Sequence, residues 1–156
     1  MTDLLEIAIK EEIEAKAFYR QASEEGGTSL GRALFARLAK EEDFHAAKAR
    51  EISEFLQRGE SPLAIEESLD RGLKLGRVLA AANDAEVPDS GVTSGELEIV
   101  NKALEIEENS KHFYEEKFQT ANTEFERRYF KALKQEEICH YAALKQYLDW
   151  LTHRTL

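Results

Sequence analysis

The sequence predicts an all-α protein, a bundle of four long helices arranged as two copies of one helix hairpin. Three observations predict this fold class. Both prolines and most glycines lie between Gly59 and Gly95, and neither residue type occurs in 96–156. The stretches without these breakers are rich in Ala, Leu, Glu and Lys, which favour helix. The sequence also aligns with itself at a fixed spacing of 95 residues.

The first hairpin is predicted from its capping and breaker residues. Its first helix is expected over about residues 3–25, because a capping box opens it and Gly26-Gly27 ends it. Its second helix is expected over about 29–58, where Gly59 ends it. The short link between them makes the two helices antiparallel neighbours.

The second hairpin is predicted in the same way. Two Thr-x-x-Glu capping boxes, which begin at Thr93 and Thr123, precede helices expected over about 94–121 and about 123–152. A break around Ala121 separates the two helices, and the short link again favours an antiparallel pair.

The connector between the hairpins, residues 59–93, is too long to be a bare loop in a compact domain. Ser61-Pro62 is typical of a helix start, so a short extra helix is expected over about 62–83. We therefore expect residues 1–156 to form a single domain with a long crossover between its two hairpins.

The internal repeat aligns residues 1–55 with residues 96–150 without a gap, and 13 of these 55 positions are identical. Random similarity between amphipathic helices does not readily place acidic and histidine residues in register. The alignment at 95 residues nevertheless places four chemically important pairs in register: Glu12/Glu107, Tyr19/Tyr114, Glu42/Glu137 and His45/His140. The repeat unit is therefore one hairpin that is used twice.

Each predicted helix carries a glutamate within its apolar stripe, because steps of three, four and seven residues return to the same face. These glutamates are Glu12, Glu42, Glu107 and Glu137. Four buried carboxylates without partners are unfavourable and repel one another. Two divalent cations would balance their charge, and His45 and His140 follow on the same stripes as Glu-x-x-His. Dimetal carboxylate bundles use this donor set, with one glutamate from each of two helices and Glu-x-x-His from each of the others.

The pattern Glu12-x6-Tyr19 with Glu42-x2-His45, repeated 95 residues later, resembles the rubrerythrin branch of the ferritin-like superfamily. The resemblance covers both hairpins and implies a ferritin-like four-helix bundle that holds two iron ions, with zinc or manganese as substitutes. It implies that Glu42 and Glu137 bridge the metals, that Glu12 and Glu107 are terminal ligands, and that His45 and His140 bind one metal each. Tyr19 and Tyr114 match tyrosines that line the site in this family, and they are the candidate catalytic residues.

The chain departs from the family pattern in three ways. It contains one cysteine, Cys139, and so has no four-cysteine rubredoxin domain to deliver electrons. Ser110 stands where typical members have an extra carboxylate, three residues after the glutamate of the third long helix. The connector also looks longer than usual. An external electron-donor protein is therefore expected. Bacterioferritin has a similar ligand pattern, but its haem needs an internal methionine and the only methionine here is Met1, so no haem is expected.

Three functions follow from these patterns. The first is a non-haem dinuclear iron oxidoreductase that reduces hydrogen peroxide or dioxygen with an external electron donor. The second is a ferroxidase or iron-handling protein, whose acidic surface attracts cations. The third is a bundle held together by a redox-silent metal that acts as an interaction protein.

Composition limits the partners. With 21 basic and 31 acidic side chains, the formal net charge is −10, which argues against nucleic acid and anionic membranes. The longest apolar run, Val78–Ala82, is far below the roughly 20 residues of a membrane helix.

The first residues show no export signal, so a cytoplasmic location is expected. A homodimer with possible hairpin exchange is expected from the long connector and from Trp150 and Tyr141 as contact surface.

Other polar residues near these motifs have simpler interpretations. His112 and His153 lack the glutamate at −3 and are expected on the surface. Glu41 and Glu136 repeat at the 95-residue spacing but lie off the apolar stripes. Each is interpreted either as a partner of the metal ligands or as a solvated charge.

Overall fold

A computed structural model describes residues 2–59 and 94–154 of the chain. These residues form four long α-helices and no strand, so the predicted all-α four-helix bundle is confirmed. The helices are α1 (Thr2–Glu25), α2 (Ser29–Gln57), α5 (Ser94–Gln119) and α6 (Glu124–Arg154). The short helix expected over about 62–83 lies outside the described residues.

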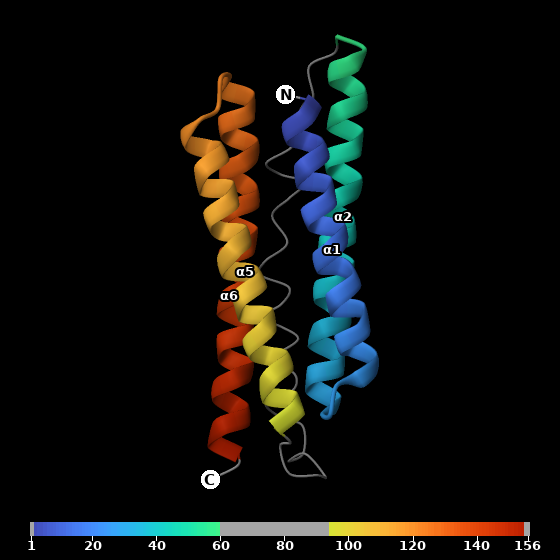
Figure 1. Ribbon diagram of the computed structural model, residues 1–156, viewed down its shortest axis with the longest axis vertical. Helices are drawn as coiled ribbons and strands as arrows, with labels where there is room; N and C mark the ends of the chain where they lie inside the picture. The colour runs from blue at the N-terminus through green and yellow to red at the C-terminus, as the bar shows by residue number, and fades with distance from the viewer. Residues whose placement is uncertain (1, 60–93, 155–156) are drawn as a thin grey trace.

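The helices pair as two antiparallel hairpins, α1 with α2 and α5 with α6 (Figure 1). α1 and α6 run in one direction, and α2 and α5 run in the other (Figure 1). The end of α2 and the start of α5 therefore lie at opposite ends of the bundle. Between the two hairpins, α1 contacts α5 and α2 contacts α6.

Local sequence determines where the helices begin and end. The Thr28 hydroxyl accepts a hydrogen bond from the Gly31 N–H at 2.9 Å, which caps α2. The Thr123 hydroxyl accepts from the Glu126 N–H at 3.1 Å, so the predicted cap of α6 is confirmed. Beyond α2, Gly59 has φ of 72°, a left-handed conformation that glycine adopts without a Cβ clash.

Glu96 joins the two hairpins at one end of the bundle. Its buried carboxylate accepts hydrogen bonds from the Gly27 N–H at 2.8 Å and from the Tyr147 hydroxyl. The hydroxyl groups of Tyr147 and Thr28 share a further hydrogen bond of 2.6 Å. Gly31 lies directly against this cluster, and a Cβ there would collide with the oxygens of Tyr147 and Glu96. Glycine at this position is therefore required by the close approach.

The interior divides into two apolar clusters with a polar layer between them. One cluster lies toward the α1–α2 turn and includes Ala22, Leu34 and Leu151. The other lies toward the α5–α6 turn and includes Leu5 and Phe130. Their burial stabilises the bundle on either side of the acidic residues. Among the described helices, none combines the length and the apolar character needed to span a membrane.

Candidate metal centre

Four glutamates, one from each helix, meet in the polar layer between the two apolar clusters. Each of them is at most 3% exposed, and the two histidines of the Glu-x-x-His motifs are fully buried. The helix period explains this convergence, because each side chain lies on the stripe that faces the bundle axis. The residues are Glu12 (α1), Glu42 and His45 (α2), Glu107 (α5), and Glu137 and His140 (α6).

These six side chains form two overlapping groups, each with the geometry to hold one metal ion. Within each group, one candidate ligand atom per residue lies within 4.8 Å of the others. The first group is Glu12, Glu42, His45 and Glu137, and the second is Glu42, Glu107, Glu137 and His140. The two groups share Glu42 and Glu137, whereas each has its own histidine and its own further glutamate.

Glu42 and Glu137 each present one carboxylate oxygen to each histidine. Oε2 of Glu42 lies 3.8 Å from Nδ1 of His45, and its Oε1 lies 2.9 Å from Nδ1 of His140. Oε1 of Glu137 lies 3.6 Å from Nδ1 of His45, and its Oε2 lies 3.5 Å from Nδ1 of His140. Both carboxylates therefore span the space between the two imidazoles.

Glu12 and Glu107 each approach a single histidine. Oε2 of Glu12 lies 3.4 Å from Nδ1 of His45, and Oε1 of Glu107 lies 3.4 Å from Nδ1 of His140. The two halves of the site therefore repeat the same contacts, as the 95-residue repeat predicts. Nδ1 is the nitrogen that faces the carboxylates in both rings.

Two tyrosines complete the site across the hairpin boundary. The Tyr19 hydroxyl in α1 donates a hydrogen bond to Glu107 in α5, and the Tyr114 hydroxyl in α5 donates to Glu12 in α1. Burial, followed by the negative charge of the accepting glutamate, raises the pKa of each phenol well above 10. Both phenols therefore remain protonated and act as hydrogen-bond donors at neutral pH.

The donor set fits metal ions because many of its buried polar atoms form no hydrogen bond. Within residues 2–59 and 94–154, one carboxylate oxygen of each glutamate and both ring nitrogens of each histidine make no hydrogen bond. Buried polar groups are normally satisfied, so these atoms call for an additional partner. Two divalent cations would balance four carboxylates, and imidazole with carboxylate suits first-row transition metals.

Protonation states in the metal-free site are strongly perturbed. Burial, together with the charge of Glu12, raises the pKa of Glu42 to about 8. Burial would also raise the pKa of Glu12, but its contacts with Glu42 and His45 outweigh burial and lower the pKa. Burial would lower the pKa values of His45 and His140, but the nearby carboxylates raise both well above 6.5. Without metal, the site therefore holds protons that a bound metal ion would have to displace.

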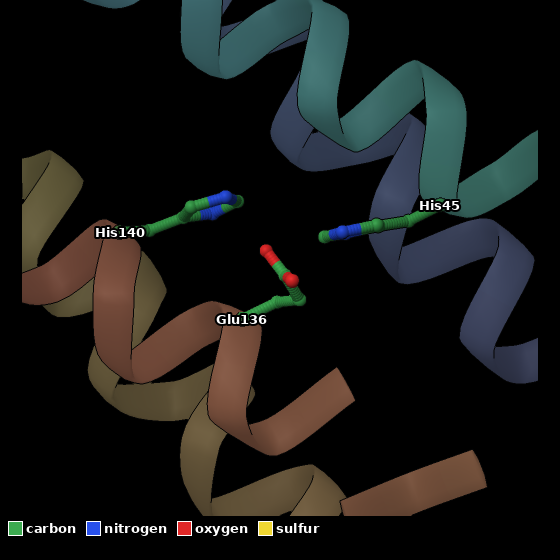
Figure 2. A group of neighbouring side chains, drawn as sticks. All are labelled: His45, Glu136 and His140. Carbon is green, nitrogen blue, oxygen red and sulfur yellow. The ribbon is translucent and has the colours of Figure 1, made fainter. Parts of the chain in front are cut away.

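A fifth glutamate, Glu136, lies against both histidines. The two imidazole rings are stacked with centroids 5.7 Å apart, and the Glu136 side chain projects toward the space between them (Figure 2). One carboxylate oxygen of Glu136 and one nitrogen of each ring lie within 4.8 Å of one another. Glu136 is only 5% exposed, so its interpretation as a solvated charge is wrong.

Glu41, the counterpart of Glu136 in the first hairpin, has a different environment. It is 1% exposed, and its Oε1 lies 3.0 Å from the Arg37 guanidinium one helical turn earlier. The interpretation of Glu41 as a solvated charge is therefore also wrong. The Arg-x-x-x-Glu spacing was the sequence signal for this ion pair. The equivalent position in α6 is Ala132, so the repeat is not symmetric here.

A pocket of about 210 Å³ lies between α1 and α5, and its lining residues lie within three positions of Glu12 or Glu107 in the sequence. It is lined by three residues of α1 and by their counterparts 95 positions later: Glu11, Glu14 and Ala15 with Ile106, Asn109 and Ser110. Equivalent positions of the two hairpins therefore line the pocket from opposite sides. Sequence periodicity did not reveal it, because it depends on how the two hairpins meet.

The remaining histidines lie away from the site. His112 is 76% exposed, and its Nε2 lies 3.2 Å from Oε1 of Glu108. His153 is also exposed, with Nδ1 2.6 Å from the backbone carbonyl oxygen of Asp149. The prediction that both are surface residues is confirmed.

Comparison with known proteins gives one match. The model of the protein family described as Rubrerythrin matches residues 3–148, which includes both hairpins and all six candidate ligands. No curated protein and no solved structure matches the chain.

Proposed function

The chain belongs to the rubrerythrin family, and from this premise we propose that it is a non-haem dinuclear iron oxidoreductase. It reduces hydrogen peroxide, or dioxygen, with electrons from an external donor. One observation carries the proposal: Glu42 and Glu137 each present one oxygen to His45 and the other oxygen to His140, as two carboxylates that bridge a pair of metal ions would.

The ligand roles follow from the two overlapping groups. Glu42 and Glu137 would contribute to holding both ions. Glu12 and His45 would hold one ion with them, and Glu107 and His140 would hold the other. When bound, two ferrous ions polarise the O–O bond of the oxidant and supply one electron each.

The chain's own residues hold this site in shape. The Tyr19 and Tyr114 hydroxyls fix one oxygen each of Glu107 and Glu12, which leaves the other oxygen of each glutamate to bind metal. The apolar clusters on either side keep bulk water from the carboxylates. This environment strengthens the electrostatic interactions within the site.

The pocket between α1 and α5 is the access route for the oxidant in this proposal. Ala15 and Ser110 face it from three residues after Glu12 and Glu107, which is one helical turn from the ligands. Both side chains are small, and a volume of about 210 Å³ admits a molecule the size of hydrogen peroxide.

Rapid mixing tests the proposal. The ferrous protein, loaded without oxygen, is mixed with hydrogen peroxide, and the absorbance of the diferric product is followed. We expect this absorbance to appear in the natural chain and in the surface control Glu105→Gln, and to be lost in Glu42→Gln. Two bound irons that give no spectral change would contradict the proposal.

Iron handling is the second candidate function, favoured by the acidic side of the pocket. Glu11 and Glu14 line it from α1, and negative charge at an opening attracts cations. A ferroxidase would oxidise many ferrous ions per chain with dioxygen and without another reductant. Arrest after two ferrous ions per chain would exclude this function.

Elemental analysis of protein purified from its native host tests the third possibility, a bundle held by a redox-silent metal. Iron as the bound metal supports the oxidoreductase, whereas stoichiometric zinc supports a structural role.

The homodimer stays a prediction. Of the two residues expected in its interface, Trp150 packs partly buried against the core and Tyr141 lies under the Lys111 ammonium at 4.3 Å.

A further inference from the structure

A row of aromatic rings leads from the candidate metal centre toward the C-terminal end of α6. It starts at Tyr19, whose hydroxyl is bonded to Glu107. Ring centroids lie 6.2 Å apart for Tyr19 and Phe35, 6.1 Å for Phe35 and Tyr147, and 6.1 Å for Tyr147 and Trp150. Trp150 is the only tryptophan of the chain and is only partly buried. The row therefore connects the buried site to the surface.

Both tyrosines of this row have a carboxylate that can take their proton. The Tyr19 hydroxyl donates to Glu107, and the Tyr147 hydroxyl donates to the buried Glu96. A phenol that loses an electron becomes a strong acid, so its proton moves along the hydrogen bond to the carboxylate. No uncompensated positive charge then remains in the apolar interior. These hydrogen bonds make both tyrosines easier to oxidise.

A second row begins at Tyr114 but differs from the first. Its centroid distances are 6.3 Å from Tyr114 to Phe130, 5.4 Å from Phe130 to Tyr129, and 6.4 Å from Tyr129 to Phe125. In the part of the chain that the structure describes, the Tyr129 hydroxyl makes no hydrogen bond. The row ends at Phe125, and phenylalanine is far harder to oxidise than tryptophan. Tyr114 has Glu12 as its acceptor, but beyond Tyr114 the described part of this row has neither a hydrogen-bonded proton acceptor nor an oxidisable end.

The repeat shows that the first row was extended in one half only. Tyr19 and Phe35 have aromatic counterparts in the second hairpin, at Tyr114 and Phe130. By contrast, the counterparts of Tyr147 and Trp150 are Ile52 and Phe55. The extension toward the surface is therefore a property of one row and not of the duplicated hairpin.

We propose that Tyr19, Tyr147 and Trp150 form a one-electron path from the surface to the metal centre, with Phe35 as the bridge between the tyrosines. The path supplies an electron when the site holds fewer ferrous ions than the oxidant requires. This inference rests on the proposed function, because it needs an oxidant at the metal centre.

The electrons and protons balance as follows. Reduction of hydrogen peroxide breaks the O–O bond and takes two electrons and two protons to give two water molecules. With one ferrous ion present, one electron comes from that ion and the other from the indole of Trp150. The indole Nε1 is buried, so the indole keeps its proton as a radical cation and both protons are taken from solvent. An external thiol then returns an electron to the indole, releases its proton to solvent and becomes a thiyl radical.

The electron moves inward in steps. Tyr19 gives an electron to the site, Tyr147 restores Tyr19 across the Phe35 ring, and Trp150 restores Tyr147. At each tyrosine, the hydroxyl proton moves to the carboxylate and returns when the next electron arrives. The oxidising equivalent thus leaves the buried ligands and reaches the surface.

Freeze-quench spectroscopy with peptide mass spectrometry tests the path. Protein loaded without oxygen with one ferrous ion per chain is mixed with hydrogen peroxide. We expect a tryptophan radical in the electron paramagnetic resonance spectrum and, without thiol, oxidised Trp150 in the peptides. In Tyr147→Phe, the oxidation of Trp150 falls to the level of metal-free protein. In Trp150→Phe, which keeps the hydrogen bonds of Tyr147, the radical is found on tyrosine.

Tyr129→Phe is the matched control, because it makes the same change in the second row and should leave the oxidation of Trp150 unaltered. Iron oxidation without any radical or product at Trp150 in the natural chain would overturn the path alone. Equal oxidation of Trp150 in metal-free protein would also overturn it, because peroxide would then act at the surface. A chain that binds no iron would overturn the proposed function as well.

Discussion

Tyr19 and Glu107 lie 88 residues apart in the sequence, and a hydrogen bond joins them across the boundary between the two hairpins. Tyr114 and Glu12 repeat the relationship in the opposite direction. Each hairpin therefore orients the carboxylate of the other. The bonds tie the hairpins together at the level of the candidate ligands, where their correct spacing matters most.

Loss of this bond should destabilise the protein. Tyr19→Phe removes a buried hydrogen bond to Glu107, and a typical intramolecular hydrogen bond contributes roughly 0.5–1.5 kcal/mol to stability. We expect the free energy of unfolding of the metal-free protein to fall by about this amount in urea titrations. Tyr129→Phe is the control, since its buried hydroxyl makes no hydrogen bond within the described residues. Equal losses in both variants would contradict this interpretation.

The stability of the metal-free protein should fall as the pH rises. The pKa of Glu42 is raised from 4.5 to about 8, and the pKa values of His45 and His140 are raised above 6.5. In this range the folded chain binds more protons than the unfolded chain, so the free energy of unfolding decreases from about pH 4.5 upward through pH 8. The lowered pKa of Glu12 has the opposite sign but acts below this range. Urea titrations at several pH values measure the slope.

Metal binding should release the same protons. Ligands bind metal in their deprotonated form, so the affinity for a divalent cation increases with pH, and an indicator dye reports proton release. With metal added, the free energy of unfolding should also fall less between pH 5 and pH 8 than it does in the metal-free protein. Metal affinity that is constant across this range would contradict the assignment of these residues as ligands.

A larger side chain in the pocket should slow the reaction without removing the metal. Ala15→Leu places added carbon atoms in the pocket between α1 and α5. We expect unchanged iron content by elemental analysis and slower oxidation by peroxide in rapid mixing. Ala17→Leu makes the same change at an exposed position of the same helix. An unchanged rate in Ala15→Leu would show that the oxidant takes another route.

Gly31→Ala should disturb the cluster that joins the hairpins at one end. The added methyl group would collide with Tyr147 and Glu96, and overpacking of a tight interior typically costs about 1–3 kcal/mol. The measurement is the thermal unfolding midpoint. Gly27→Ala serves as the control, because its Cβ would meet Oε2 of Glu96 at an ordinary distance of 3.6 Å. A larger loss in Gly27→Ala would contradict the packing argument.

Glu136→Gln should weaken metal binding, although Glu136 is not one of the six candidate ligands. Residues that orient metal-binding histidines typically contribute about 10–100-fold in metal affinity. We expect a loss of this size in competition titrations with a chelator, with the helical content unchanged. Glu105→Gln, which alters an exposed side chain of α5, should bind metal normally. Full affinity in Glu136→Gln would exclude an orienting role.

The inward stripes could be predicted because they depend on local periodicity and on the repeat. Glu12 and Glu107 lie on such stripes, and both are buried in the structure. Glu136 is one position off its stripe, so its burial depends on how α6 packs against α2, which periodicity does not describe. The contact between Thr28 and Tyr147 joins residues 119 positions apart and likewise depends on tertiary packing.

The duplication also defines the smallest unit able to enclose a metal pair. One hairpin supplies three of the six donors and a phenol whose acceptor belongs to the other hairpin. A solitary half-molecule would thus leave its carboxylates facing solvent and its tyrosine unmatched. Two hairpins are the minimum, whether covalently joined in one polypeptide or contributed by separate molecules that associate face to face.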